Sequence, residues 1–150
     1  MKKHLTGMIV TGLLSAPALA QEFTCQLENN KYVSVVVEKG KTPAYRYGTL
    51  AKPEIPLPVK GNAKNGVYVG QTMFSGGGSA YIRFENGPFN YVVYSGMGRG
   101  WEFTGLAVYK GDKVINKKVC KTDLGIYDVL NYGLPEDESG EIYAMDPNSQ

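Results

Sequence analysis

The sequence predicts an all-β fold, most economically a small eight-stranded antiparallel barrel. Runs of four to eight β-branched and aromatic residues recur from residue 22 to residue 120, separated by Gly, Asn and Pro. Helical periodicity is absent from this stretch. The chain has 150 residues, of which 43% are hydrophobic, and this suits one domain. Closure into a barrel removes exposed strand edges, so we expect it ahead of the alternative, a β-sandwich.

The first 20 residues have the three parts of a secretory signal peptide. They are a basic start at 1–4, a short apolar run at 5–14 and the small-residue cleavage site Ala18-Leu19-Ala20. The mature chain is therefore expected to begin at Gln21, and the protein to be periplasmic or secreted. Nothing after residue 20 approaches the run of about 20 apolar residues that a membrane-spanning helix needs, so no membrane span is expected.

The first strands of the mature chain are predicted to form a hairpin and then reach a sheet edge. Hydrophobic and polar residues alternate over 22–27 and again over 32–37, with a turn between them, and a third strand covers 44–50. The stretch 52–58 contains three prolines, which cannot donate to a ladder of hydrogen bonds. We expect an edge or a polyproline-like connection there.

The later strands are predicted to follow one another as a meander. Asn86-Gly87 is the strongest hairpin signal, because both residues tolerate the positive φ of a tight turn. Gly111-Asp112 marks a further turn. The strands are expected at residues 67–74, 80–85, 89–95, 101–110 and 113–120.

The only two cysteines, Cys25 and Cys120, are predicted to form a disulfide that closes the domain 21–121. Oxidising compartments permit such bonds, and the predicted export places the chain in one. The alternative is a pair of buried free thiols.

Charge is separated along the chain. Residues 21–120 hold 13 Lys and Arg and 7 Asp and Glu, a net charge of +6, whereas residues 121–150 hold one Lys and 7 acids, a net charge of −6. The segment 122–150 is therefore predicted to be an acidic, partly disordered tail, with a short helix over 123–130 capped by Thr122.

The mature chain is expected to have no histidine, because the single one, His4, lies in the signal peptide. This excludes Ser-His-Asp and Cys-His catalysis and imidazole ligation of zinc. The acids before Cys120 are scattered singly and form no recognisable acid/base pair in the sequence. We expect a protein that is not an enzyme, with no metal and no cofactor.

Two glycine-rich loops are the candidate binding elements. In residues 75–79, three consecutive glycines let the backbone approach a partner closely and expose N–H groups and two hydroxyls; a merely flexible hairpin is the alternative. In residues 96–100, Arg99 lies between Tyr94 and Trp101, which suits recognition of a carboxylate or another protein; an ordinary solvated arginine is the alternative. No helix follows this second loop, so we do not expect nucleotide binding, and export argues against nucleic acid.

Four short segments carry a resemblance to a known family. They are Phe23-Thr24-Cys25, Ser75-Gly76-Gly77-Gly78-Ser79-Ala80-Tyr81, Tyr94-Ser95-Gly96 and Val108-Tyr109-Lys110-Gly111-Asp112-Lys113-Val114, which closes on Cys120. Together, over roughly residues 22–121, they are similar to the bacterial inhibitors of C-type lysozyme. The resemblance implies an eight-stranded barrel whose Ser- and Gly-containing loop enters the lysozyme cleft, helped by a basic side chain from a second loop. By position it implies Ser75 or Ser79 as the inserting hydroxyl, Tyr81 as the aromatic after the loop and Arg99 as the basic group.

The sequence thus predicts an exported, non-enzymatic inhibitor of a lysozyme. Two functions of other classes stay open, a periplasmic β-barrel that binds a glycan or other small ligand and a structural envelope protein. The candidate partner-binding residues are Ser75, Gly76, Gly77, Gly78, Ser79, Tyr81, Tyr94, Arg99 and Trp101.

Overall fold

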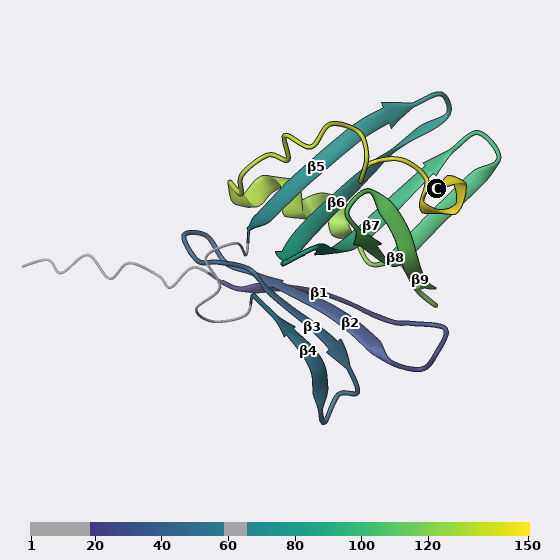
Figure 1. The fold of residues 1–150 in the computed structure, drawn as a ribbon. Coiled ribbons are helices and arrows are strands. Elements are labelled where there is room, and N and C mark those ends of the chain that lie inside the picture. The colour runs from purple at the N-terminus through teal and green to yellow at the C-terminus, as the bar shows by residue number, and fades with distance from the viewer. Residues whose placement is uncertain (1–18, 59–65) are drawn as a thin grey trace, which may run out of the picture.

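The computed structural model describes residues 19–58 and 66–150 (Figure 1). Nearly all of the predicted signal peptide therefore lies outside the described residues. The described chain is mostly β, with nine strands in two antiparallel sheets and two short 3₁₀ helices.

The first sheet has four antiparallel strands in chain order. Alternate residues of its strands are buried, among them Val33, Val35 and Val37 on one face of the second strand, as the period of two in the sequence predicts. The strands are β1 (Gln21–Gln26), β2 (Tyr32–Val37), β3 (Ala44–Gly48) and β4 (Pro53–Leu57).

The second sheet has five antiparallel strands, also in chain order. The predicted hairpin forms one residue later than expected, since Asn86 pairs with Phe89 and the turn begins at Gly87, whose φ is 58°. The strands are β5 (Val67–Phe74), β6 (Gly77–Asn86), β7 (Phe89–Gly98), β8 (Trp101–Lys110) and β9 (Lys113–Val119).

The main core lies between the two sheets. Val33 and Tyr45 of the first sheet belong to the same buried cluster as Ile82, Phe84 and Val93 of the second. The predicted disulfide is confirmed: Cys25 of β1 is bonded to Cys120, which directly follows β9. Backbone hydrogen bonds from Glu28 N to Val119 O (2.9 Å) and from Lys121 N to Gln26 O (2.8 Å) accompany it. The two sheets are thus joined at one corner.

The prediction of a closed eight-stranded barrel is wrong. The structure has nine strands, and the two sheets do not close into a barrel, because no ladder joins β4 to β5 among the described residues. The additional strand is β4, the proline-rich stretch that the sequence predicts as an edge or a connection. Pro53 and Pro56 lack the N–H groups that pairing with a further strand requires. The alternative of two facing sheets is the one that the structure adopts.

The chain after Cys120 also differs from its prediction. The helix is a 3₁₀ helix, η1 (Ile126–Tyr132), which begins later than expected because Gly125 adopts a left-handed conformation before it. The N–H of Gly125 donates to Asp123 Oδ1 at 3.1 Å, and no side chain caps the helix. Ile126 and Val129 are buried against the main core.

The acidic end of the chain, predicted as a partly disordered tail, packs in the structure along the five-stranded sheet. Residues 135–146, which we call the C-terminal segment, start beside β5 and continue across the face that points away from β1–β4 (Figure 1). We call this face the outer face. A second 3₁₀ helix, η2 (Pro147–Ser149), follows. Composition shows the charge of this segment but not the side chains that it meets.

None of the helices among the described residues is long and apolar enough to cross a membrane.

The disulfide is expected to contribute strongly to stability, because it links residues 95 positions apart and joins the two sheets. Replacing both cysteines, Cys25→Ser with Cys120→Ser, should lower the free energy of unfolding by about 2 to 5 kcal/mol, measured by urea denaturation. A reductant should lower the wild-type midpoint to that of the double variant and leave the variant unaffected. Equal midpoints for the oxidised wild type and the variant would contradict a structural role.

Candidate functional site

The two glycine-rich segments meet at one end of the five-stranded sheet. Their turns lie at Ser75-Gly76, between β5 and β6, and at Arg99-Gly100, between β7 and β8. The backbone N–H of Arg99 donates to the carbonyl of Ser75 at 3.2 Å. Behind them the rings of Phe74 and Trp101 meet edge to face, 5.3 Å between centroids. Turns that lie 24 positions apart in the sequence therefore form one surface.

The loops are shorter than predicted, because most of their glycines belong to strands. Gly77 and Gly78 lie in β6, where a Cβ on Gly77 would sit 2.2 Å from the carbonyl oxygen of Met97. The glycines thus permit the close approach of β6 and β7 and do not form a flexible loop. Gly76 and Gly100, with φ of 82° and 80°, occupy the turn conformations that favour glycine, one in each loop.

The surface at this end of the five-stranded sheet combines a guanidinium, exposed backbone groups and a hydroxyl with the thioethers of two methionines. Ser75, Gly76 and Arg99 are exposed. Met73 and Met97 flank Gly78 in the sheet and are 86% and 46% exposed. We call these five residues the hairpin-tip surface. Exposed methionines adapt to irregular partner surfaces, and arginine binds carboxylates through paired hydrogen bonds.

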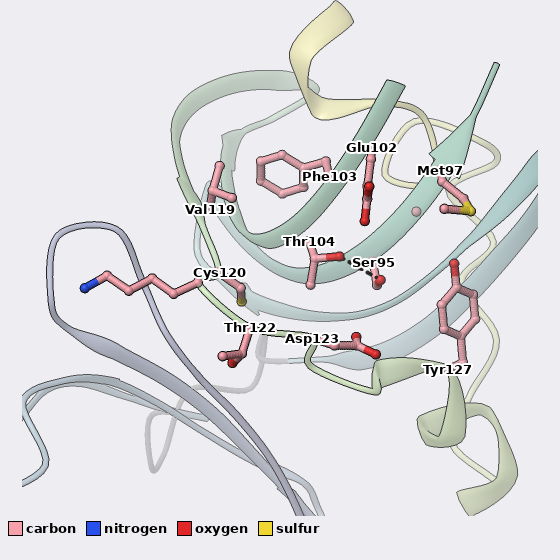
Figure 2. A pocket seen from close by; sticks show the side chains of 12 residues that line it. Ser95, Met97, Glu102, Phe103, Thr104, Val119, Cys120, Thr122, Asp123 and Tyr127 are labelled. Carbon is pink, nitrogen blue, oxygen red and sulfur yellow. Dashed lines mark hydrogen bonds between the residues drawn. The ribbon is translucent and has the colours of Figure 1, made fainter. Parts of the chain in front are cut away.

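A groove of about 610 Å³, lined in part by Met97 of the hairpin-tip surface, opens between β7, β8 and the residues that follow β9 (Figure 2). Ser95 Oγ and Thr104 Oγ1 share a hydrogen bond of 2.9 Å within it, and the Tyr127 hydroxyl donates to Gly78 O at 3.2 Å. Its lining comprises Ser95, Gly96, Met97, Glu102, Phe103, Thr104, Val119, Cys120, Lys121, Thr122, Asp123 and Tyr127. The groove therefore offers hydroxyls, carboxylates and one half-exposed aromatic ring, a set that the sequence did not single out.

Three of the predicted partner-binding residues are buried under the C-terminal segment. Ser79, Tyr81 and Tyr94 are 3%, 1% and 0% exposed. The hydroxyls of Ser79 and Tyr94 both donate to the carbonyl of Ala144, at 2.7 and 3.0 Å. The Tyr81 hydroxyl donates to Asp137 Oδ2 at 2.9 Å. The structure thus brings Ser75, Gly76 and Arg99 together at the surface. The buried Ser79, Tyr81 and Tyr94 are not part of that surface.

A buried ion pair that sequence reasoning missed holds the C-terminal segment. Arg83 of β6, 3% exposed, donates from Nε to Asp137 Oδ2 at 2.7 Å and from Nη2 to Asp137 Oδ1 at 2.8 Å. Its Nη1 donates to Glu85 and Asn90, both at 2.7 Å. The arginine in the predicted strand 80–85 was the available signal, since a cation on a covered sheet face needs an anionic partner.

Aromatic rings complete the surroundings of Arg83. The rings of Tyr68 and Tyr143 each lie 4.7 Å from its guanidinium carbon. Tyr143 also meets Tyr109 edge to face at 4.9 Å, and its hydroxyl donates to Gly111 O at 3.0 Å. The guanidinium is thus bonded at its edge and covered by rings, an arrangement that suits arginine and not lysine.

The ion pair perturbs the acidity of both side chains. Burial alone would raise the pKa of Asp137, but hydrogen bonds from Arg83, from Ser139 and from Tyr81 outweigh it and lower the pKa from 3.8 to about 2. Burial opposes the charged form of Arg83, yet its bonds to Asp137 and Glu85 raise its pKa. The pair therefore stays ionised throughout the physiological range.

In the described parts of the chain, no three His, Cys, Asp or Glu side chains gather as a metal site would require. In comparisons with known proteins, no family model, curated protein or solved structure matches this chain.

The lowered pKa of Asp137 predicts acid sensitivity in a defined range. Between about pH 4 and pH 2 the unfolded chain binds a proton at Asp137 that the folded chain does not, so stability should fall as the pH falls through this window. Urea denaturation at several pH values should show a shallower loss for Asp137→Asn than for the wild type. Glu138→Gln, at the exposed neighbouring position, is the matched control and should follow the wild type. Parallel curves for the wild type and Asp137→Asn would refute the assignment.

Proposed function

We propose that this protein is an exported, non-enzymatic inhibitor that blocks the active-site cleft of a muramidase with its hairpin-tip surface. The observation that carries the proposal is the contact between the two turns, in which Arg99 N donates to Ser75 O at 3.2 Å. A hydroxyl, backbone groups and a guanidinium are thus exposed together at one end of the five-stranded sheet.

The chemistry of this end suits a cleft that contains carboxylates. Muramidases act through a pair of carboxyl groups on either side of the scissile bond. The Arg99 guanidinium and the Ser75 hydroxyl can donate to such groups, and a charge-assisted hydrogen bond contributes about 1.5 to 3 kcal/mol. No described acidic side chain forms an ion pair with Arg99, so its charge is available to a partner.

The rest of the fold supports such a role by holding the two turns in place. Strands β5 to β8 pair continuously up to the turns, since Phe74 pairs with Gly77 and Gly98 with Trp101. A preorganised loop loses little conformational entropy when it binds. The proposal uses Ser75, Gly76 and Arg99 and leaves out the residues beneath the C-terminal segment.

Binding of a small polar ligand, such as a saccharide, is a second candidate function, and the groove favours it. Its volume of about 610 Å³ lies within the usual range for ligand sites, about 300 to 1,000 Å³. Glu102 and Asp123 can accept hydrogen bonds from sugar hydroxyls, and the half-exposed ring of Tyr127 can stack on a sugar face.

Two substitutions separate these functions. Arg99→Ala and Ser75→Ala should each weaken inhibition of a susceptible muramidase by about 1 to 3 kcal/mol, because central contacts dominate an interface, and should change thermal stability little. Lys113→Ala, at the opposite end of the sheet, is the matched control for charge and should inhibit as the wild type does. Residual lysis of cell walls at increasing inhibitor concentration measures these effects.

Tyr127→Ala tests the groove, in the same lysis assay and in calorimetry with soluble glycan fragments. If the protein inhibits through the hairpin-tip surface, this substitution should leave inhibition unchanged. If the groove binds saccharides, the substitution should abolish the binding of soluble glycan fragments in calorimetry. The inhibitor proposal fails if the wild-type protein, at high micromolar concentration, leaves every tested muramidase fully active, since specific interfaces reach tighter affinities than that.

A further inference from the structure

The outer face of the five-stranded sheet has the composition of a binding surface. Beside the apolar Val92, Phe103 and Ala107, it carries Arg83 and the tyrosines 68, 81, 94 and 109, whereas the opposite face of the same strands presents Ile82, Phe84 and Val93. A buried arginine is rare on a covered sheet face, because its charge needs a partner. Tyrosine and arginine are residues that concentrate binding energy at protein interfaces.

The C-terminal segment covers this face through a few anchors, as a bound peptide does. The side chain of Asp137 is 1% exposed, and Tyr143 and Ala144 are 6% and 2% exposed. The residues between the anchors, 138–142, are exposed. An integral strand of the core would bury every second side chain, so the segment behaves as a ligand that the sheet recognises at separate points.

The sheet also binds the backbone of the segment in two places. At the edge of β5, Val69 N donates to Pro135 O (2.9 Å) and Asp137 N donates to Val69 O (2.8 Å). On the face, Ser79 and Tyr94 donate to the carbonyl of Ala144. Addition of a peptide to a sheet edge, with side-chain pockets beside it, is a recurring mode of peptide recognition.

We propose that the outer face is a peptide-binding site for an acidic segment with a following aromatic residue, and that the C-terminal segment of a second copy of this chain can replace the resident one. Exchange conserves every contact, because the two segments are identical. The segment is joined to the body through Gly133, an exposed residue with a φ of 70°, which provides a hinge just before the first anchor. Exchange of identical elements at such a hinge produces a dimer.

The charge of the chain supports this occupant. The body is basic and the last thirty residues are acidic, so the end of one copy is electrostatically complementary to the body of another. The resident segment competes at the high effective concentration of a tethered ligand, about millimolar, so exchange should need high protein concentration or a weakened resident segment. This proposal does not depend on the muramidase proposal.

Peptide binding to the full-length protein tests the site. The probe is a fluorescent synthetic peptide of residues 133–150, and anisotropy reports binding. The Asp137→Asn protein, whose own segment lacks the anchoring carboxylate, should bind it at least tenfold more tightly than the wild-type protein. A peptide carrying Asp137→Asn should bind at least tenfold more weakly to the same protein. A Glu138→Gln peptide, changed at an exposed position, should bind as the unmodified peptide does.

Two further measurements locate the peptide and the exchange. The Val69 amide should lose protection from hydrogen exchange in the Asp137→Asn protein and regain it when the peptide binds. Sedimentation of the wild-type protein at increasing concentration should show a dimer that dissociates slowly after dilution. If Asp137→Asn does not fold, Tyr143→Ala, which removes the aromatic anchor and keeps the ion pair, takes its place with the same expectations.

Several results would overturn the proposal. One is an Asp137→Asn protein that fails to bind the peptide, whether or not its Val69 amide is protected. Equal binding of a peptide with the same composition in scrambled order is another, because it would show attraction by charge alone. A third is a protein with both Arg83→Gln and Asp137→Asn that binds the peptide as tightly as the Asp137→Asn protein does. This double variant lacks the guanidinium that should bind the peptide, and it leaves neither charge of the pair buried without a partner. A strictly monomeric wild type at millimolar concentration would refute the exchange.

Discussion

The covalent joint between the two sheets constrains the rest of the molecule. Cys25 and Cys120 fasten β1 to the end of β9, and two backbone hydrogen bonds continue the contact. The disulfide therefore joins the sheets at one corner, and the edge strands farthest from it, β4 and β5, form no ladder with each other among the described residues. Each edge is protected differently: β4 carries prolines, whereas β5 pairs with residues of the C-terminal segment. Over the described residues the two sheets thus form an open sandwich, fastened covalently at one corner and with each far edge covered or blocked in its own way.

The Arg83–Asp137 pair determines what the outer face presents. Its two charges are buried, and such a pair resists separation because either partner alone would be left uncompensated. Since Asp137 is acidic and lies in the most acidic part of the chain, the pair also brings that part onto the basic body. The acidic end of the chain therefore lies against the basic body, and its Tyr143 and Ala144 cover the buried cluster on the outer face of the sheet.

Two separate surfaces result, and they suit different partners. The hairpin-tip surface is exposed and carries Arg99, whose guanidinium can bind carboxylates. The outer face is broad and already occupied by a segment of the chain itself. Ser79 and Tyr81 are close in sequence to Ser75, which lies in the turn before β6. They lie within β6, two residues apart, and therefore both point to the outer face. The resemblance to lysozyme inhibitors could not separate these two surfaces.

The sequence by itself determined most of the strand positions and the Cys25–Cys120 pairing, and it limited the proline-rich stretch 52–58 to an edge or a connection, because strand alternation, the number of thiols and proline chemistry can be read from the residues directly. Only the tertiary structure decided whether the sheets close, how long the loops at Ser75 and Arg99 are, and where the acidic end of the chain lies. A period of two shows that a strand has two faces, but not what covers each one. The partner of Arg83 lies 54 positions away in the sequence, and no local pattern connects them. Their contact depends on the disulfide at Cys120, on the helix η1 and on the pairing with β5, which together bring the end of the chain back to the five-stranded sheet.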